Sequence, residues 1–129
     1  MTTAVLDASA IIALLKGERG ASKVAGVIAD AVVGVVNQAE VVSHFVHLGA
    51  GVDEIQAMLG ALPYGIMNAD EELAWEAGAL RAVTARAGLS LGDRFCLALA
   101  KRLKIPAYTA DKAWKDIAAE AGARVVAIR

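Results

Sequence analysis

The sequence lacks the features that would place it among disulfide-rich, fibrous or multidomain proteins. Its 129 residues include one cysteine, so no disulfide can form within the chain. That cysteine, Cys96, lies in the apolar run FCLALA, which favours a small buried side chain in a reducing compartment. There are only two prolines, and no repeat, low-complexity segment or linker divides the chain. We therefore expect one domain over residues 1–129.

Neither sign of charge dominates, and no apolar run is long. Thirteen basic and fourteen acidic residues give a net charge of -1, which excludes a general polyanion binder but not a local nucleic-acid site. The early apolar stretch ASAIIALL is too short to span a bilayer, and no basic leader precedes it. We expect a cytoplasmic protein with no membrane contact. A mean hydropathy of +0.52 leaves some apolar surface for a partner.

Apolar runs that are typical of strands alternate with stretches that are typical of helices. We expect strands over 3–6, 31–36, 64–67, 106–109 and 123–128. Helices are expected over 9–15, from about 21, over 38–48, from about 53, and over 69–87, 91–103 and 112–121. This alternation predicts an α/β fold whose parallel sheet is covered by helices on both faces.

Four acidic residues are expected to meet at one edge of this sheet, namely Asp7, Glu40, Asp93 and Asp111. The carboxyl ends of parallel strands converge on one edge, where such folds bind ligands. Two like charges about 4 Å apart repel by roughly 4 kcal/mol near a protein surface, and a divalent cation removes this conflict. An all-carboxylate site suits Mg²⁺ or Mn²⁺ better than zinc or copper.

Each of these residues also has an ordinary structural interpretation. Asp7 and Asp111 each precede a helix and could cap it, and Asp93 has capping-box spacing to Ser90. Glu40 could be a solvated helix residue. Capping alone, however, does not explain why all four are predicted at the same edge, because caps can fall at either edge of a sheet.

Several neighbouring polar or aromatic residues could belong to the site. Ser9 follows Asp7 by two and Thr109 precedes Asp111 by two, so their hydroxyls could orient the carboxylates, although both types are common in turns and strands.

The remaining side chains of this kind are two histidines and two tryptophans. His44 and His47 continue the helical face of Glu40; polar packing is favoured for both, with His44 lining the cleft and His47 outside it. Trp75 and Trp114 are more typical of core or partner surface than of substrate stacking, and the sequence leaves open which applies.

Taken together, the motifs resemble those of PIN-domain ribonucleases, specifically the VapC-type toxins of type II toxin-antitoxin modules. The resemblance spans essentially the whole chain. It rests on VLDASAIIALL, on Glu40 in VVNQAEVV, on LSLGDRFCLALA and on YTADKAW, in that order. It implies a three-layer α/β/α sandwich, Mg²⁺ or Mn²⁺ at the acidic cluster, and endonucleolytic cleavage of RNA.

Carried over by position, the resemblance implies an acidic site of Asp7, Glu40, Asp93 and Asp111, supported by Ser9 and Thr109. We hypothesise that the three aspartates hold one or two metal ions and that Glu40 binds metal or positions the attacking water. Basic residues at the rim would offset repulsion of the RNA. Candidates by position are Arg94, Lys112, Lys16 and Arg19, although solvated surface charge is the simpler interpretation of each.

The resemblance also implies a homodimer and inhibition by a small cognate antitoxin protein. The segment 10–29 offers an apolar surface for that partner, or is simply core against the sheet. Three other functions stay open. A non-catalytic PIN-like interaction module and a housekeeping RNA-processing nuclease would share the scaffold, while a phosphotransfer protein is disfavoured because VLDAS lacks a second nearby Asp.

Overall fold

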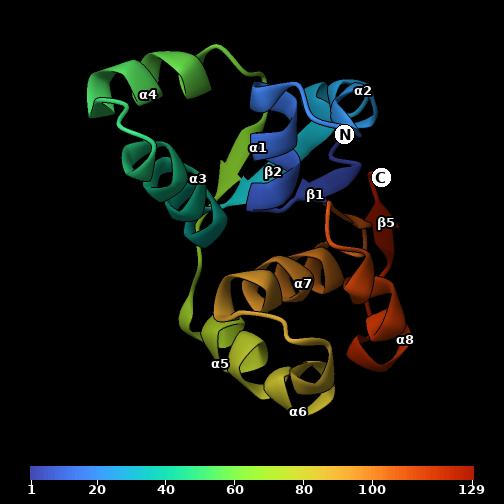
Figure 1. The fold of residues 1–129 in the computed structure, drawn as a ribbon. Helices are drawn as coiled ribbons and strands as arrows, with labels where there is room; N and C mark the ends of the chain where they lie inside the picture. The colour runs from blue at the N-terminus through green and yellow to red at the C-terminus, as the bar shows by residue number, and fades with distance from the viewer.

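The computed structural model describes residues 1–129 and contains one five-stranded parallel sheet in the order β3-β2-β1-β4-β5 (Figure 1). The strands are β1 (Ala4–Leu6), β2 (Ala31–Gly34), β3 (Gly65–Met67), β4 (Ala107–Thr109) and β5 (Val125–Ala127). All four pairings are parallel, and Val5 in β1 is in register with Val32 on one side and Ala107 on the other. The predicted parallel sheet is therefore confirmed, with β1 at its centre.

Helices cover both faces of this sheet, which gives the three-layer α/β/α sandwich (Figure 1). On one face lie α1 (Ala8–Lys16), α2 (Ala21–Ala25), the 3-10 helix η1 (Ile28–Asp30), α3 (Val35–His47) and α4 (Val52–Gly60). On the other lie α5 (Glu71–Ala79), α6 (Arg81–Thr84), η2 (Ala85–Ala87), α7 (Leu91–Leu103), η3 (Lys112–Asp116) and α8 (Ala118–Ala121). None of these helices is long and apolar enough to cross a membrane.

Alternation along the central strand divides the core in two. Ala4 and Leu6 pack in the cluster that includes Ile11 of α1, whereas Val5 packs in the cluster that includes Leu97 of α7. Successive side chains of a strand point to opposite faces, so one short apolar run supplies both clusters. This is why β1 is fully buried and reads as a continuous apolar run.

The second predicted strand, over 31–36, ends earlier than expected, because Val35 and Val36 belong to α3. Gly34 is extended and forms the N-cap, so the helix follows the strand directly. β-branched residues disfavour a helix only weakly, and tertiary packing overrides that preference here. The early start places Asn37 in a buried position of the first helical turns, which matters for the site below.

Two long predicted helices are broken. The stretch 69–87 divides into α5, α6 and η2; the hydroxyl of buried Thr84 donates to the Leu80 carbonyl at 2.9 Å, a bond that often bends helices. The stretch 112–121 divides at Ile117, whose φ of -118° interrupts the helix while its side chain is fully buried. In both cases an irregular backbone accompanies burial of a residue at the break.

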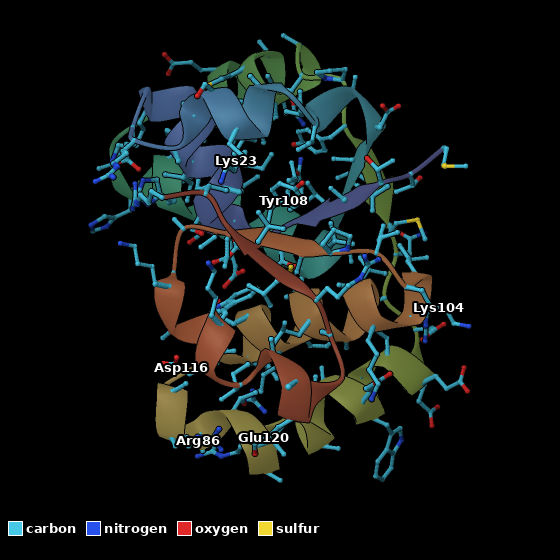
Figure 2. The ribbon with its side chains drawn as sticks, turned by 90° about the vertical axis from the view of Figure 1, so that its right-hand side faces the viewer. Lys23, Arg86, Lys104, Tyr108, Asp116 and Glu120 are labelled. Atoms are coloured by element: carbon cyan, nitrogen blue, oxygen red, sulfur yellow. The ribbon has the colours of Figure 1, made fainter.

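The two broken segments are joined to each other by an ion pair. The guanidinium of Arg86 in η2 donates to the Glu120 carboxylate of α8, and also to the Asp116 carbonyl at 3.3 Å (Figure 2). Both side chains are largely exposed, so the pair contributes little stability by itself. Its role is to hold the last turn before Gly88 against the end of η3.

The two tryptophans differ completely in burial, and this yields a stability prediction. Trp114 is 0% exposed in the core, whereas Trp75 is 74% exposed on α5. Trp114→Ala should lower the free energy of unfolding by about 3–5 kcal/mol, the range for deleting a buried aromatic. In the isolated monomer, Trp75→Ala should change the free energy of unfolding by no more than about 0.5 kcal/mol. Urea unfolding of both variants checks this, and equal losses would contradict it.

Candidate functional site

The four acidic residues lie at the carboxyl edge of the three central strands. Asp7 directly follows β1, Asp111 comes two residues after β4, and Glu40 sits on the helix that follows β2. Asp93 joins them from the first turn of α7, which packs across β1, β2 and β4. The structure thus brings these segments to one side, as the order β2-β1-β4 requires.

Asp7 is the most buried member and is held by three donors. Its Oδ1 accepts from the Ser9 hydroxyl at 2.6 Å and from the Ala10 N–H at 3.0 Å, and its Oδ2 accepts from the Thr109 hydroxyl at 2.9 Å. The Ala10 bond makes Asp7 the N-cap of α1. Burial raises the pKa of Asp7 to about 6, although these bonds oppose it, and the charge of Asp93 adds to the rise.

Ser9 and Thr109 connect the end of β1 to the loop after β4. Besides donating to Asp7, the Ser9 hydroxyl accepts from the Ala110 N–H at 2.9 Å and the Thr109 hydroxyl accepts from the Asp111 N–H at 3.0 Å. Both hydroxyls therefore orient the Asp7 carboxylate directly. Thr109 fixes Asp111 only through its backbone.

Asp93 and Asp111 both cap helices, as the ordinary interpretation predicted. Asp93 Oδ2 accepts from the Ser90 N–H at 2.9 Å while Ser90 Oγ accepts from the Asp93 N–H at 3.2 Å, which completes a capping box. Asp111 Oδ1 accepts from the Ala113 N–H at 2.9 Å. In each residue the second carboxylate oxygen makes no hydrogen bond within the protein.

Glu40 is held by a residue that the sequence analysis missed. Its Oε1 accepts from Asn37 Nδ2 at 2.8 Å, and the same nitrogen donates to the Gly92 carbonyl at 3.0 Å. The Glu40 carboxylate rests against Gly92, where any Cβ would overlap it. Two signals were available: Asn37 precedes Glu40 by three on the same helical face, and a glycine directly precedes Asp93.

These carboxylates influence one another electrostatically. Burial raises the pKa of Glu40 and of Asp93; the Asn37 bond opposes the rise in Glu40, and the charge of Asp93 adds to it. Asp111 raises the pKa of Asp93 in the same way. Crowded, partly buried carboxylates favour a bound proton or cation.

This donor set fits a hard divalent cation, because it offers carboxylate oxygens and each residue has an oxygen not fully used by the protein. As the side chains are placed, no three acidic, histidine or cysteine groups lie close enough together to form a ready-made metal site. A cation would therefore be held only if the carboxylates move closer together. Glu40, Asp93 and Asp111 would then turn about their one fixed oxygen, whereas Asp7 is held at both oxygens.

Among the basic residues predicted to contact RNA, Arg94 is contradicted by the structure. It is buried, and its guanidinium donates to the carbonyls of Ser90, Ala77 and Gly78 at 3.3–3.4 Å. Its charge is used to fix α7 against the end of α5, so it is not available at the rim.

The other three basic residues are exposed. Lys112 follows Asp111 directly, and an RNA contact there stays a prediction. Lys16 lies at the C-terminal end of α1, about 13 Å along the helix from its Asp7 cap, and pairs with Glu18 at 3.8 Å. Arg19 lies beyond it, so both are candidates only for a more distant part of an RNA.

The histidines of α3 line one open hollow together with Glu40 and Ser43. None of the three aspartates lines this hollow, so the expectation that His47 lies outside the acidic cleft stays a prediction. The hollow follows the whole outer face of the helix rather than only its first turns. His44 Nε2 is buried without a hydrogen-bond partner, while its ring packs edge-on to Phe45.

The sequence matches the PIN domain family over residues 4–120. The chain belongs to the PIN domain family. A comparison with curated protein sequences gives no match. The residues matched include all four acidic positions and the elements that carry them.

Solved structures share the fold of this PIN domain at low sequence identity. A chain of the DNA-bound VapBC of Salmonella typhimurium has a TM-score of 0.74 at 16% identity, covering 100% of both chains. A chain of FitAcB from Neisseria gonorrhoeae has a TM-score of 0.75 at 19% identity, and a chain of a toxin-antitoxin complex from Klebsiella pneumoniae has a TM-score of 0.72 at 23% identity. Each match covers 98% of both chains. At these identities the likeness concerns the fold alone.

The raised pKa of Asp7 predicts how the stability of the metal-free PIN domain depends on pH. Folding raises this pKa from 3.8 to about 6, so the folded state binds the proton more tightly. Stability should fall by about 3 kcal/mol as pH rises from about 4 to about 6, and this contribution should be flat above that. Asp7→Asn should remove this slope and be the more stable protein at pH 7.

Urea unfolding in EDTA across pH 4–8 measures both proteins. Asp116→Asn is the matched control, since Asp116 lies outside the site in η3. Parallel pH profiles of the wild type and Asp7→Asn would contradict the assigned cause.

Proposed function

We propose that this PIN domain is an Mg²⁺- or Mn²⁺-dependent endoribonuclease that hydrolyses RNA phosphodiester bonds. The supporting observation is the set of four carboxylates, Asp7, Glu40, Asp93 and Asp111, at one sheet edge. Glu40, Asp93 and Asp111 are each anchored through one oxygen and leave the other without a hydrogen bond in the protein, whereas Asp7 is held at both oxygens. Membership of the PIN family supports nuclease chemistry for such a site.

In the proposed mechanism the three aspartates and Glu40 would hold the metal, and Glu40 would also position the attacking water. A divalent ion lowers the pKa of bound water, orients the phosphate and neutralises developing charge. Asp7 is oriented for this task by the hydroxyls of Ser9 and Thr109. Glu40 accepts the proton of the water at its free Oε2, and its raised pKa makes it a better proton acceptor.

We further propose that the biological role is that of a toxin paired with an antitoxin. One of the similar structures, from Klebsiella pneumoniae, is a toxin-antitoxin complex, which supports this role. A housekeeping RNA-processing nuclease would have the same chemistry, and a non-catalytic PIN-like module would have the same fold. Growth arrest on expression that the antitoxin relieves would distinguish a toxin from a housekeeping nuclease. RNA cleavage would distinguish either nuclease from a non-catalytic module.

Removing one carboxylate charge should abolish cleavage without unfolding the protein. Asp93→Asn keeps a capping oxygen but loses a metal ligand, so we expect cleavage to fall by at least about 100-fold. Purified protein is incubated with a pool of cellular RNAs in Mg²⁺, Mn²⁺ or EDTA. Asp116→Asn should keep full activity. Cleavage that persists in EDTA or in Asp93→Asn would refute the assignment.

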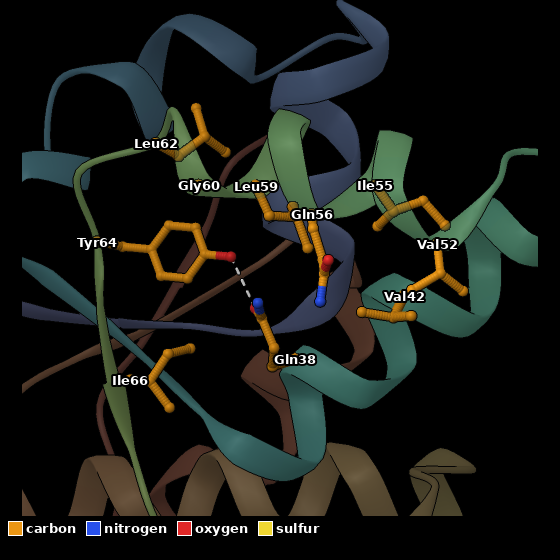
Figure 3. A pocket seen from close by; sticks show the side chains of 10 residues that line it. All are labelled: Gln38, Val42, Val52, Ile55, Gln56, Leu59, Gly60, Leu62, Tyr64 and Ile66. Atoms are coloured by element: carbon orange, nitrogen blue, oxygen red, sulfur yellow. Dashed lines mark hydrogen bonds between the residues drawn. The ribbon is translucent and has the colours of Figure 1, made fainter.

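The surface expected to bind an antitoxin needs revision. Residues 10–29 were predicted to offer an apolar face, but Ala10, Ile11 and Ala13 are fully buried against the sheet, so much of that face is core. An apolar groove lies instead between α3, α4 and the edge strand β3, where Leu62, Tyr64 and Ile66 of the β3 segment face Val52, Ile55 and Leu59 of α4 (Figure 3). We propose this groove for an apolar segment of the antitoxin.

A homodimer also stays part of the proposal, and α5 offers a surface for it. The exposed Trp75 adjoins a shallow hollow that includes Ala74 and Gly78. A knob beside a hollow on one helix is self-complementary, as a two-fold interface requires. Glu71 and Arg81 make no ion pair within the chain. If the α5 helices of two protomers packed antiparallel, Glu71 of one protomer would lie opposite Arg81 of the other.

The two surfaces predict opposite effects for two exposed apolar positions. Ile66→Glu should weaken antitoxin binding by at least about 30-fold and leave the dimer intact. Trp75→Glu should produce a monomer that still binds the antitoxin. Each variant is co-expressed with the small protein encoded beside its gene, then analysed by affinity capture and light scattering. Antitoxin bound normally by Ile66→Glu would reject the groove, and an intact Trp75→Glu dimer would reject α5.

A further inference from the structure

The Asn37 side chain uses both hydrogens of its amide inside the acidic site. It is 1% exposed, and Nδ2 donates to Glu40 Oε1 at 2.8 Å and to the Gly92 carbonyl at 3.0 Å. An amide nitrogen carries two hydrogens, so its donor capacity is filled. The opposite orientation of the amide would direct Oδ1 at a carboxylate and a carbonyl, both of which are acceptors. The chemistry therefore fixes which way Asn37 points.

The other end of the same amide has no partner. Asn37 Oδ1 is buried without a hydrogen bond and lies toward Gly34, where an added Cβ would be 3.4 Å away. A buried acceptor without a donor destabilises a fold, so an apolar side chain would serve packing better. Packing alone does not account for an asparagine here, which directs attention to the two groups that Nδ2 binds.

Both groups that Nδ2 binds are part of the acidic site: Glu40 is one of its carboxylates, and the Gly92 carbonyl is in the peptide unit that precedes Asp93. The Gly92 carbonyl and the Asp93 N–H share one peptide plane; Asn37 holds the carbonyl, and Ser90 Oγ holds the N–H at 3.2 Å. The missing side chain of Gly92 lets the Glu40 carboxylate rest on this turn. One amide thus ties Glu40 of α3 to the turn of α7 that carries Asp93.

We propose that Asn37 is a positioning residue that keeps the Glu40 carboxylate beside the α7 turn that carries Asp93, so that both carboxylates can reach one divalent metal. The inference rests on the proposed metal-dependent function. Like charges repel, and half-buried Glu40 is free to turn toward solvent if the amide is lost. A partner that orients a metal ligand typically changes metal affinity 10- to 100-fold when it is removed.

A graded series of substitutions tests this proposal, with Mn²⁺ affinity measured by calorimetry. Asn37 can donate two hydrogen bonds, Asn37→Thr one and Asn37→Leu none. We expect Mn²⁺ affinity to fall about 10- to 100-fold in Asn37→Leu and by an intermediate factor in Asn37→Thr. Gln38→Leu is the matched control: this neighbouring amide accepts only from the Tyr64 hydroxyl, at 2.7 Å, outside the acidic site, and its loss should leave Mn²⁺ affinity unchanged.

The thermal midpoint in EDTA separates positioning from a merely structural role. Positioning predicts that Asn37→Leu unfolds within a few degrees of the wild-type midpoint, because removal of the unpaired Oδ1 offsets the loss of the two Nδ2 hydrogen bonds, while its Mn²⁺ affinity falls. Wild-type affinity in Asn37→Leu, or in Asn37→Thr if the leucine variant does not fold, overturns the proposal. A wild type without Mn²⁺ binding overturns it as well. Wild type that binds Mn²⁺ but cleaves no RNA refutes the nuclease and leaves the affinity series to decide on Asn37.

Discussion

Repulsion among four carboxylates is the constraint on which the rest of this site depends. Each charge in this partly buried site loses solvation, and the charges of Asp93 and Asp111 add repulsion to that cost. The fold offsets this with donors taken from its own framework: the N–H groups of helix starts, two hydroxyls and one amide. The pKa of Asp7 still rises to about 6, chiefly because its carboxylate is buried and to a smaller degree because of the charge of Asp93.

The sheet order explains how residues so distant in sequence reach one another. With β1 in the centre and β2 and β4 beside it, the segments after three strands lie next to each other at the carboxyl edge. Helix α7 crosses the same region, so its first turn supplies Asp93 without a strand of its own. Parallel pairing and right-handed crossovers leave little freedom in this arrangement. Geometry that serves folding therefore also gathers the charges.

The sequence was informative where function depends on local order along the chain. The strands, the capping geometry of Asp7 and the Ser90–Asp93 capping box all follow from residues within a few positions of one another. Asn37 and Gly92 could not be paired in advance, because their contact spans 55 residues and depends on how α3 starts. The broken helices escaped prediction for the same reason, since tertiary burial fixes the breaks.

Arg94 shows how the same limit produces a wrong functional prediction. Beside Asp93 in the sequence, it has the charge and the place expected of a residue that binds RNA. In the structure it is buried, and its guanidinium is used by three carbonyls at the end of α5 and the start of α7. A helix C-terminus has carbonyls without partners, and a cation there is stabilising.

Capping and metal binding, between which the sequence left the decision open, are compatible in the same carboxylate. Asp93 and Asp111 each cap a helix through one oxygen and leave the other free of protein hydrogen bonds, and Glu40 follows the same pattern with Asn37. A carboxylate held at one oxygen loses most of its rotational freedom, so less entropy is lost when the other oxygen binds a ligand. The caps that stabilise the helices therefore prepare the same residues for binding.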